Sequence, residues 1–196
     1  MNVITDTLDR SADTDSTLIP ALAERWSPRG FDAAAVIDER LLTTVLEAAR
    51  WAPSASNSQP SRFIVARRGS DDFATIETGL MGFNRAWASA ASVLIVNIAE
   101  LETEGKENRW ARYDLGQAVA HLSVQAQHEG LHSHQMGGID TGVLSDAFGL
   151  AENHAIVSVI ALGVLADVAT LDPALLERES APRSRKPLSE LLISNA

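Results

Sequence analysis

Two short apolar runs constrain the fold of this chain most strongly. "ASVLIVNIA" (91–99) and "AIVSVIALGVL" (155–165) are dense in valine and isoleucine, and both are far too short to cross a membrane as helices. Apolar residues at successive positions are typical of strands that are buried on both faces. A third β-prone run, "RFIVARR" (62–68), ends at Gly69. We therefore predict a sheet with a well-buried centre.

The segments between these runs predict helices. Asp38 is a plausible N-cap, Pro53 disfavours helical backbone just before it, and Gly130 is a stop signal. A glycine-rich loop is expected at "HQMGGID" (134–140), and a polar tail is expected beyond Pro173. The predicted helices span residues 39–52, 71–81, 110–129 and 142–148. The resulting order of helices and strands indicates an α+β or α/β protein.

Composition limits the organisation and the partners of the protein. The 196 residues suit one domain, so we assign residues 1–19 to a flexible, polar N-terminal arm and residues 20–196 to a single domain. A net charge of −10 argues against nucleic-acid binding, and we expect no membrane partner and no signal peptide. The chain has no cysteine, which excludes disulfides and thiolate chemistry and fits a cytoplasmic protein.

Several common catalytic motifs are missing. The sequence contains no dinucleotide-binding GxGxxG, no phosphate-binding GxxxxGK[ST], no GxSxG and no HExxH. His132 and His134 form an HxH pair without a third ligand nearby in sequence, so we predict hydrogen-bonded loop histidines and no metal site. Asp114, inside a predicted helix, is open to two roles, as a structural hydrogen-bonding residue or as a catalyst.

Four separated segments carry a resemblance when they are taken together. They are "RWSPRGF" (25–31), "APSASNSQP" (52–60), "HSHQMGGID" (132–140) and "PRSRKPLSELL" (182–192). Each motif alone is weak, but the four occur in order and at the expected distances. Over residues 20–192 the chain resembles the FMN-dependent nitroreductase family.

The resemblance implies a fold and an activity. The fold would be α+β and nitroreductase-like, with a central, mostly antiparallel sheet flanked by helices, in an intertwined homodimer that binds FMN at its interface. The activity would be a ping-pong reaction in which NADH or NADPH gives a hydride to flavin N5. A nitroaromatic, a quinone or a similar small electrophile would then be reduced. The alternatives are a non-catalytic flavin-binding or sensing dimer, and a same-fold flavoenzyme with another chemistry, such as a dehydrogenase or dehalogenase.

The resemblance also assigns cofactor-binding residues. The arginines would bind the FMN phosphate and the ring edge, because guanidinium groups pair bidentately with phosphate. The loop that follows Pro53 would be lent to the flavin of the neighbouring subunit. The full implied set is Arg25, Trp26, Ser27, Arg29, Pro53, Ser54, Ala55, Asn57, Asn84, Met136, Gly137, Gly138, Arg183 and Arg185.

No side chain is expected to act as nucleophile or general base, because the cofactor carries the redox chemistry. Flavin N5 would be the reactive centre, supported by Arg29 and by the backbone of Gly137 and Gly138. Glycine allows the backbone to approach a planar ring closely. Arg29 would also stabilise the negative charge of the reduced flavin.

Overall fold

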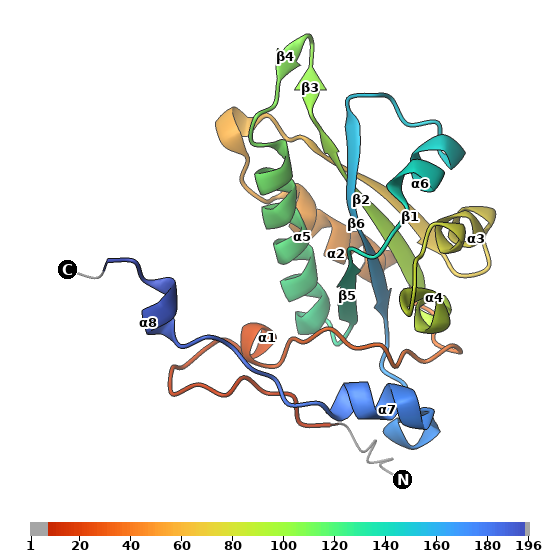
Figure 1. Cartoon of the computed structure of the whole chain (residues 1–196), viewed down its shortest axis with the longest axis vertical. Coiled ribbons are helices and arrows are strands. Elements are labelled where there is room, and N and C mark those ends of the chain that lie inside the picture. The colour runs from red at the N-terminus through yellow and green to blue at the C-terminus, as the bar shows by residue number, and fades with distance from the viewer. Residues whose placement is uncertain (1–7, 195–196) are drawn as a thin grey trace.

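A four-stranded antiparallel sheet forms the centre of the protein (Figure 1). We analysed a computed structural model, which describes residues 8–194. The strands are β1 (Ser61–Arg67), β2 (Val93–Glu100), β5 (His132–Met136) and β6 (His154–Gly163), in the order β1-β2-β6-β5. The short strands β3 (Glu102–Thr103) and β4 (Lys106–Glu107) form a separate hairpin. The expectation of an α+β fold with a mostly antiparallel sheet is confirmed.

The predicted helices form close to their expected bounds. The Asp38 side chain caps α2 by accepting a hydrogen bond from the Leu41 N–H. The α-helices are α1 (Pro20–Ala23), α2 (Glu39–Arg50), α3 (Asp71–Thr78), α4 (Asn84–Trp87), α5 (Ala111–His128), α6 (Thr141–Ala147), α7 (Pro173–Ser180) and α8 (Leu188–Leu191). Single 3₁₀ turns are η1 (Ala55–Asn57), η2 (Ala88–Ala90) and η3 (Val168–Thr170).

Helices cover both faces of the sheet, as the continuous apolar runs require. Successive side chains of a strand point to opposite faces. In β2, Leu94 and Val96 belong to a core shared with α3 and α6, whereas Val93 and Ile95 belong to a second core shared with α2 and α5. Figure 1 shows α5 on one side of the sheet and α3, α4 and α6 on the other. The sheet is therefore the middle of three layers.

Two predictions of local structure are wrong. His132 and the first residues of the loop expected at 134–140 instead form strand β5, because residues 132–136 pair with β6 from His132–Gly163 to Met136–Val159. The expected polar tail beyond Pro173 begins with helix α7, in which Asp172 is the N-cap and Pro173 occupies the first turn. Both elements carry residues of the candidate site.

The two ends of the chain run side by side along the edge of the molecule where α1, α7 and α8 lie (Figure 1). The Ala12 N–H donates to the Ala23 carbonyl at 2.8 Å, and Arg10 Nη1 donates to the Ala181 carbonyl at 2.6 Å. Residues 1–7 of the expected flexible arm lie outside the described residues. Within residues 8–194, no helix has both the length and the apolar character needed to span a membrane.

Candidate functional site

Six arginines gather in one pocket of about 180 Å³, between the N-terminal and C-terminal segments of the chain. The structure brings together all the arginines that the sequence implicated, with Trp26 and Ser27 beside them. It adds Arg10 from the N-terminal segment and Arg178 from α7, which sequence reasoning missed. The lining residues are Arg10, Arg25, Trp26, Ser27, Arg29, Arg178, Arg183 and Arg185.

The cations of this pocket perturb one another. Burial lowers the pKa of Arg25 below its ordinary value, and the nearby charge of Arg185 lowers it further. The pKa of Arg183 is lowered by burial and then by the charges of Arg185, Arg25 and Arg10. Like charges held together in this way favour the binding of an anion.

Three of the guanidinium groups have no acceptor in the described part of the chain. Arg25, Arg29 and Arg178 donate no side-chain hydrogen bond to any residue between 8 and 194. Arg183 differs, because its Nη1 donates to the Arg10 carbonyl and, at 3.1 Å, to the Ala23 carbonyl. Arg183 therefore fastens the N-terminal segment, whereas Arg25, Arg29 and Arg178 can bind a ligand. Arg185 can do so as well, because only its Nη1 is engaged, by the carbonyl of neighbouring Ser184.

Cation–π contacts hold the two added arginines at the pocket. The Arg10 guanidinium lies 4.9 Å from the centre of the Trp26 ring, and that of Arg178 lies 4.2 Å from the Phe83 ring. Phe83 immediately precedes Asn84, so the second contact connects the pocket to the next group of predicted residues. Sequence reasoning could not find Arg10, because a lone arginine in a polar segment carries no local signal.

Asn84 and Gly138 meet at the end of β5. Asn84 Nδ2 donates to the Gly138 carbonyl at 3.2 Å, and the Met81 N–H donates to the same oxygen at 3.0 Å. A Cβ atom at Gly138 would lie 3.0 Å from Asn84 Nδ2, whereas one at Gly137 would meet open space. The Met136 side chain is buried in the core, so only its backbone can face a ligand.

The loop after α2 has a strained and well-anchored backbone. Ser56, Asn57 and Gln59 have positive φ angles of 51°, 57° and 49°. Such angles are uncommon outside glycine and cluster at functional sites. Ser54 Oγ accepts a hydrogen bond from the Gln59 N–H at 3.0 Å, which closes the turn.

Asp114 anchors this loop to α5. Its carboxylate is buried, and Oδ2 accepts a hydrogen bond from the Ala55 N–H at 3.0 Å. The structural role that the sequence left open for Asp114 is thus present in the structure. His134, expected in a loop, instead lies in β5, where Nδ1 is 2.8 Å from the Pro28 carbonyl.

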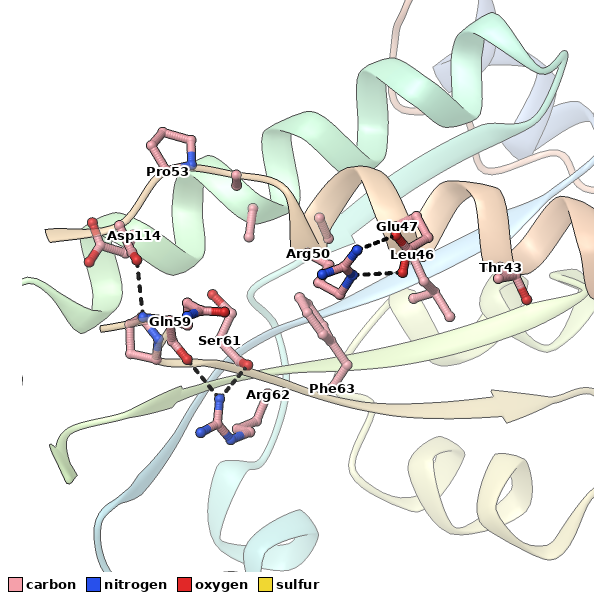
Figure 2. A pocket seen from close by; sticks show the side chains of 15 residues that line it. Thr43, Leu46, Glu47, Arg50, Pro53, Gln59, Ser61, Arg62, Phe63 and Asp114 are labelled. Carbon is pink, nitrogen blue, oxygen red and sulfur yellow. Dashed lines mark hydrogen bonds and ion pairs between the residues drawn. The ribbon is translucent and has the colours of Figure 1, made fainter. Parts of the chain in front are cut away.

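A cleft of about 360 Å³ lies beside the same loop, between the end of α2 and the start of β1 (Figure 2). Leu46 and Phe63 give it apolar walls, Pro53 and Asp114 border it, and the Glu47–Arg50 ion pair stands at its edge. The cleft shares no lining residue with the arginine pocket. The arginines and the Pro53 loop residues that were predicted to bind the cofactor therefore lie at separate places in one chain.

Comparison with known proteins identifies the family. The profile of the nitroreductase family matches residues 22–77 and 71–164, which is more than half of the chain. The chain belongs to the nitroreductase family. The resemblance inferred from the four motifs is thereby confirmed.

Three relatives illustrate the breadth of the match. An uncharacterized 15.4 kDa protein of Mycolicibacterium smegmatis is 40% identical over 140 residues, which are 66% of this chain and 92% of that protein. The crystal structure of an oxidoreductase containing FMN is 35% identical and has a TM-score of 0.88, covering 97% of this chain and 98% of that one. A structure from Desulfovibrio desulfuricans in complex with FMN is 24% identical, with a TM-score of 0.75 over 92% and 99% of the two chains, and shows the shared fold alone.

Within this nitroreductase chain, the arginine pocket and the Pro53 loop lie near opposite ends of α5. Asp114, in the first turns of α5, contacts the loop, whereas Figure 1 shows α1, next to the arginine pocket, beside the other end of the helix. The stretch of α5 from Asp114 to His128 is roughly 20 Å long, at about 1.5 Å per residue.

Proposed function

We propose that this member of the nitroreductase family is an FMN-dependent oxidoreductase that uses NADH or NADPH to reduce a small electrophilic acceptor, such as a nitroaromatic or a quinone. The arginine pocket carries the proposal. Three guanidinium groups without acceptors among residues 8–194 face a space of about 180 Å³. The FMN phosphate carries close to two negative charges and would supply the missing acceptors.

The chemistry of the residues fits the phosphate end of FMN. Guanidinium groups stay charged and form paired hydrogen bonds with phosphate oxygens. Arg25, Arg29 and Arg178 would bind the phosphate together with the part of the Arg185 guanidinium that does not contact the Ser184 carbonyl, while Arg183 would keep the N-terminal segment in place. Since the Arg29 side chain lines the same pocket as the others, we assign it to the phosphate in preference to the reduced ring.

The Asn84–Gly138 contact would orient the flavin ring. The Arg178–Phe83 contact joins it to the arginine pocket, so a molecule bound by its phosphate can extend toward it. Because a Cβ at Gly137 would meet open space, a flat ring could approach the backbone closely there. When bound, FMN would supply the redox chemistry, taking a hydride at N5 from the nicotinamide and reducing the acceptor in a second, ping-pong half-reaction.

The position of the Pro53 loop supports a homodimeric site. The loop is displaced from the arginine pocket by most of the length of α5, roughly 20 Å. A loop that contacts the flavin would thus serve the flavin bound by a second copy of the chain. Ser54 and Ala55 would face that ring, and Asn57 would offer it an amide donor and acceptor.

Arg185→Ala tests the phosphate assignment, with Arg40→Ala as a control of equal charge change on the exposed surface of α2. We expect Arg185→Ala to weaken FMN binding at least about tenfold, because it removes a charge-assisted hydrogen bond, and Arg40→Ala to leave binding unchanged. Flavin fluorescence titration measures both. Equal affinities in the two variants would refute the assignment.

Turnover separates the enzyme from a flavin-binding sensor. Steady oxidation of NADH or NADPH in the presence of a nitroaromatic or quinone is expected for the enzyme. A protein that binds FMN but gives only one reduction per flavin would support the sensor instead.

A further inference from the structure

The carbonyl oxygen and the N–H of a single peptide unit are each hydrogen-bonded to a buried side chain. His134 Nδ1 lies 2.8 Å from the Pro28 carbonyl oxygen, and the Arg29 N–H donates to Glu179 Oε1 at 2.9 Å. The Pro28 C=O and the Arg29 N–H belong to the same peptide unit. That unit immediately precedes the Arg29 side chain, which lines the arginine pocket.

The buried surroundings of His134 determine which ring nitrogen carries a proton. His134 is only 9% exposed, and its ring centre lies 4.6 Å from that of Trp87 in the core. A carbonyl oxygen can only accept, so Nδ1 carries the proton. Burial lowers the pKa of His134 and the charge of Arg29 lowers it further, while the hydrogen bonds to the backbone of Pro28 and Ser27 oppose this shift.

Glu179 is the carboxylate on the other side of the peptide. It is 2% exposed and lies on α7, just before Arg183 and Arg185 in sequence. Burial raises its pKa, while the backbone N–H groups of Arg29 and Gly30 and the charges of Arg29 and Arg10 oppose that rise. These two hydrogen bonds connect the Pro28–Arg29 peptide to β5, which leads to Gly137, and to α7, which leads to the C-terminal arginines.

We propose that His134 and Glu179 are positioning residues. By holding the Pro28–Arg29 peptide through hydrogen bonds, they orient the Arg29 side chain toward the bound anion. The proposal rests on the assignment of the arginine pocket to the FMN phosphate. A buried peptide group needs hydrogen-bond partners for stability alone, so the test must separate positioning from folding. Riboflavin lacks the phosphate of FMN. A positioning role therefore predicts that the ratio of FMN to riboflavin affinity falls when either hydrogen bond to the peptide is lost.

The variants come in matched pairs in the full-length chain. Glu179→Leu and His134→Leu each remove one hydrogen bond to the peptide. By contrast, Glu179→Gln keeps an acceptor oxygen, and His134→Asn keeps a donor near the position of Nδ1. Leu122→Ala is the control for lost stability, because Leu122 is buried in the core of the opposite face. Urea unfolding without cofactor reports the stability of each variant.

Two measurements decide the proposal. We expect the leucine variants to lower the ratio of FMN to riboflavin affinity about tenfold, the loss that follows from one misplaced charge-assisted hydrogen bond. The conservative variants should keep the ratio within about threefold of wild type, and Leu122→Ala should lose stability without changing it. Independently of any flavin, hydrogen exchange in residues 26–31 should accelerate in Glu179→Leu and not in Glu179→Gln.

An unchanged affinity ratio in both leucine variants would overturn the positioning role, as would unchanged exchange in residues 26–31. A ratio that falls equally in Leu122→Ala would also overturn it, since loss of stability would then explain the effect. A wild-type protein that binds no FMN would refute the proposed function instead. The exchange measurement would still decide whether the Glu179 side chain holds the Pro28–Arg29 peptide in place.

Discussion

Removing the Asp114 carboxylate is expected to release the loop after α2. Asp114 is buried, and its Oδ2 accepts from the Ala55 N–H at 3.0 Å, while Oδ1 accepts a weaker bond of 3.4 Å from Gln117 Nε2. Asp114→Ala leaves the partly buried Ala55 N–H without a partner. Hydrogen bonds to charged groups contribute about 1.5–3 kcal/mol, so we expect a loss of stability of about 2 kcal/mol.

The size of the chain converts this loss into a melting temperature. Unfolding entropy is about 2.1 cal/mol/K per residue, or about 0.4 kcal/mol/K for the whole chain, so 2 kcal/mol lowers Tm by about 5 °C. Thermal unfolding followed by circular dichroism measures the shift. Hydrogen exchange in residues 53–60 should accelerate more than in the core of the sheet. The positive φ angles of Ser56, Asn57 and Gln59 will favour relaxation of the freed loop.

Two controls make the prediction refutable. Asp114→Asn keeps an acceptor oxygen and should cost less than Asp114→Ala, whereas Gln117→Ala removes only the 3.4 Å bond and should change stability by less than about 0.5 kcal/mol. If Asp114→Ala melts within 1 °C or so of wild type, or if exchange in the loop is unchanged, the carboxylate does not anchor the loop.

Two further predictions concern stability. Gly79→Ala places a Cβ 2.5 Å from buried Leu144 Cγ and should lower the free energy of unfolding by about 1–3 kcal/mol. Gly116→Ala, whose Cβ would have no neighbour within 4 Å, should stabilise α5 by up to about 1 kcal/mol. Urea unfolding measures both, and equal stabilities of the two variants would contradict the prediction. Burial lowers the pKa of His132 from 6.5 to about 4, so the folded state binds fewer protons than the unfolded state between these values. Stability should therefore fall as pH drops from 6.5 toward 4, by up to about 3 kcal/mol from this residue. His132→Phe should flatten that part of the pH profile, and an unchanged profile would exclude the residue as its cause.

Local pattern predicted the elements whose formation depends on local physics. The runs that became β2 and β6 are apolar at successive positions because both faces of the sheet are covered, and a strand buried in this way carries its own signal. Asp38 and Gly130 bounded α2 and α5 through capping preferences that act within one turn. The motif spacing was enough to identify the family.

Elements without such a signal were missed. β5 contains two histidines, a serine and a glutamine, and it is a strand because β6 offers it hydrogen-bonding partners. The sequence marks of α7 were present in Asp172 and Pro173, but its charged residues resemble a solvated tail until Glu179 is buried against the Arg29 backbone.

The candidate site divides in the same way. The family resemblance of the sequence nominated four arginines for the proposed flavin phosphate, and their guanidinium chemistry belongs to the residue type. Only the tertiary structure decided that Arg10 and Arg178 join the other four arginines and that Asp114 anchors the loop. These contacts join residues far apart along the chain, and their partners are chosen by packing, which no local pattern records.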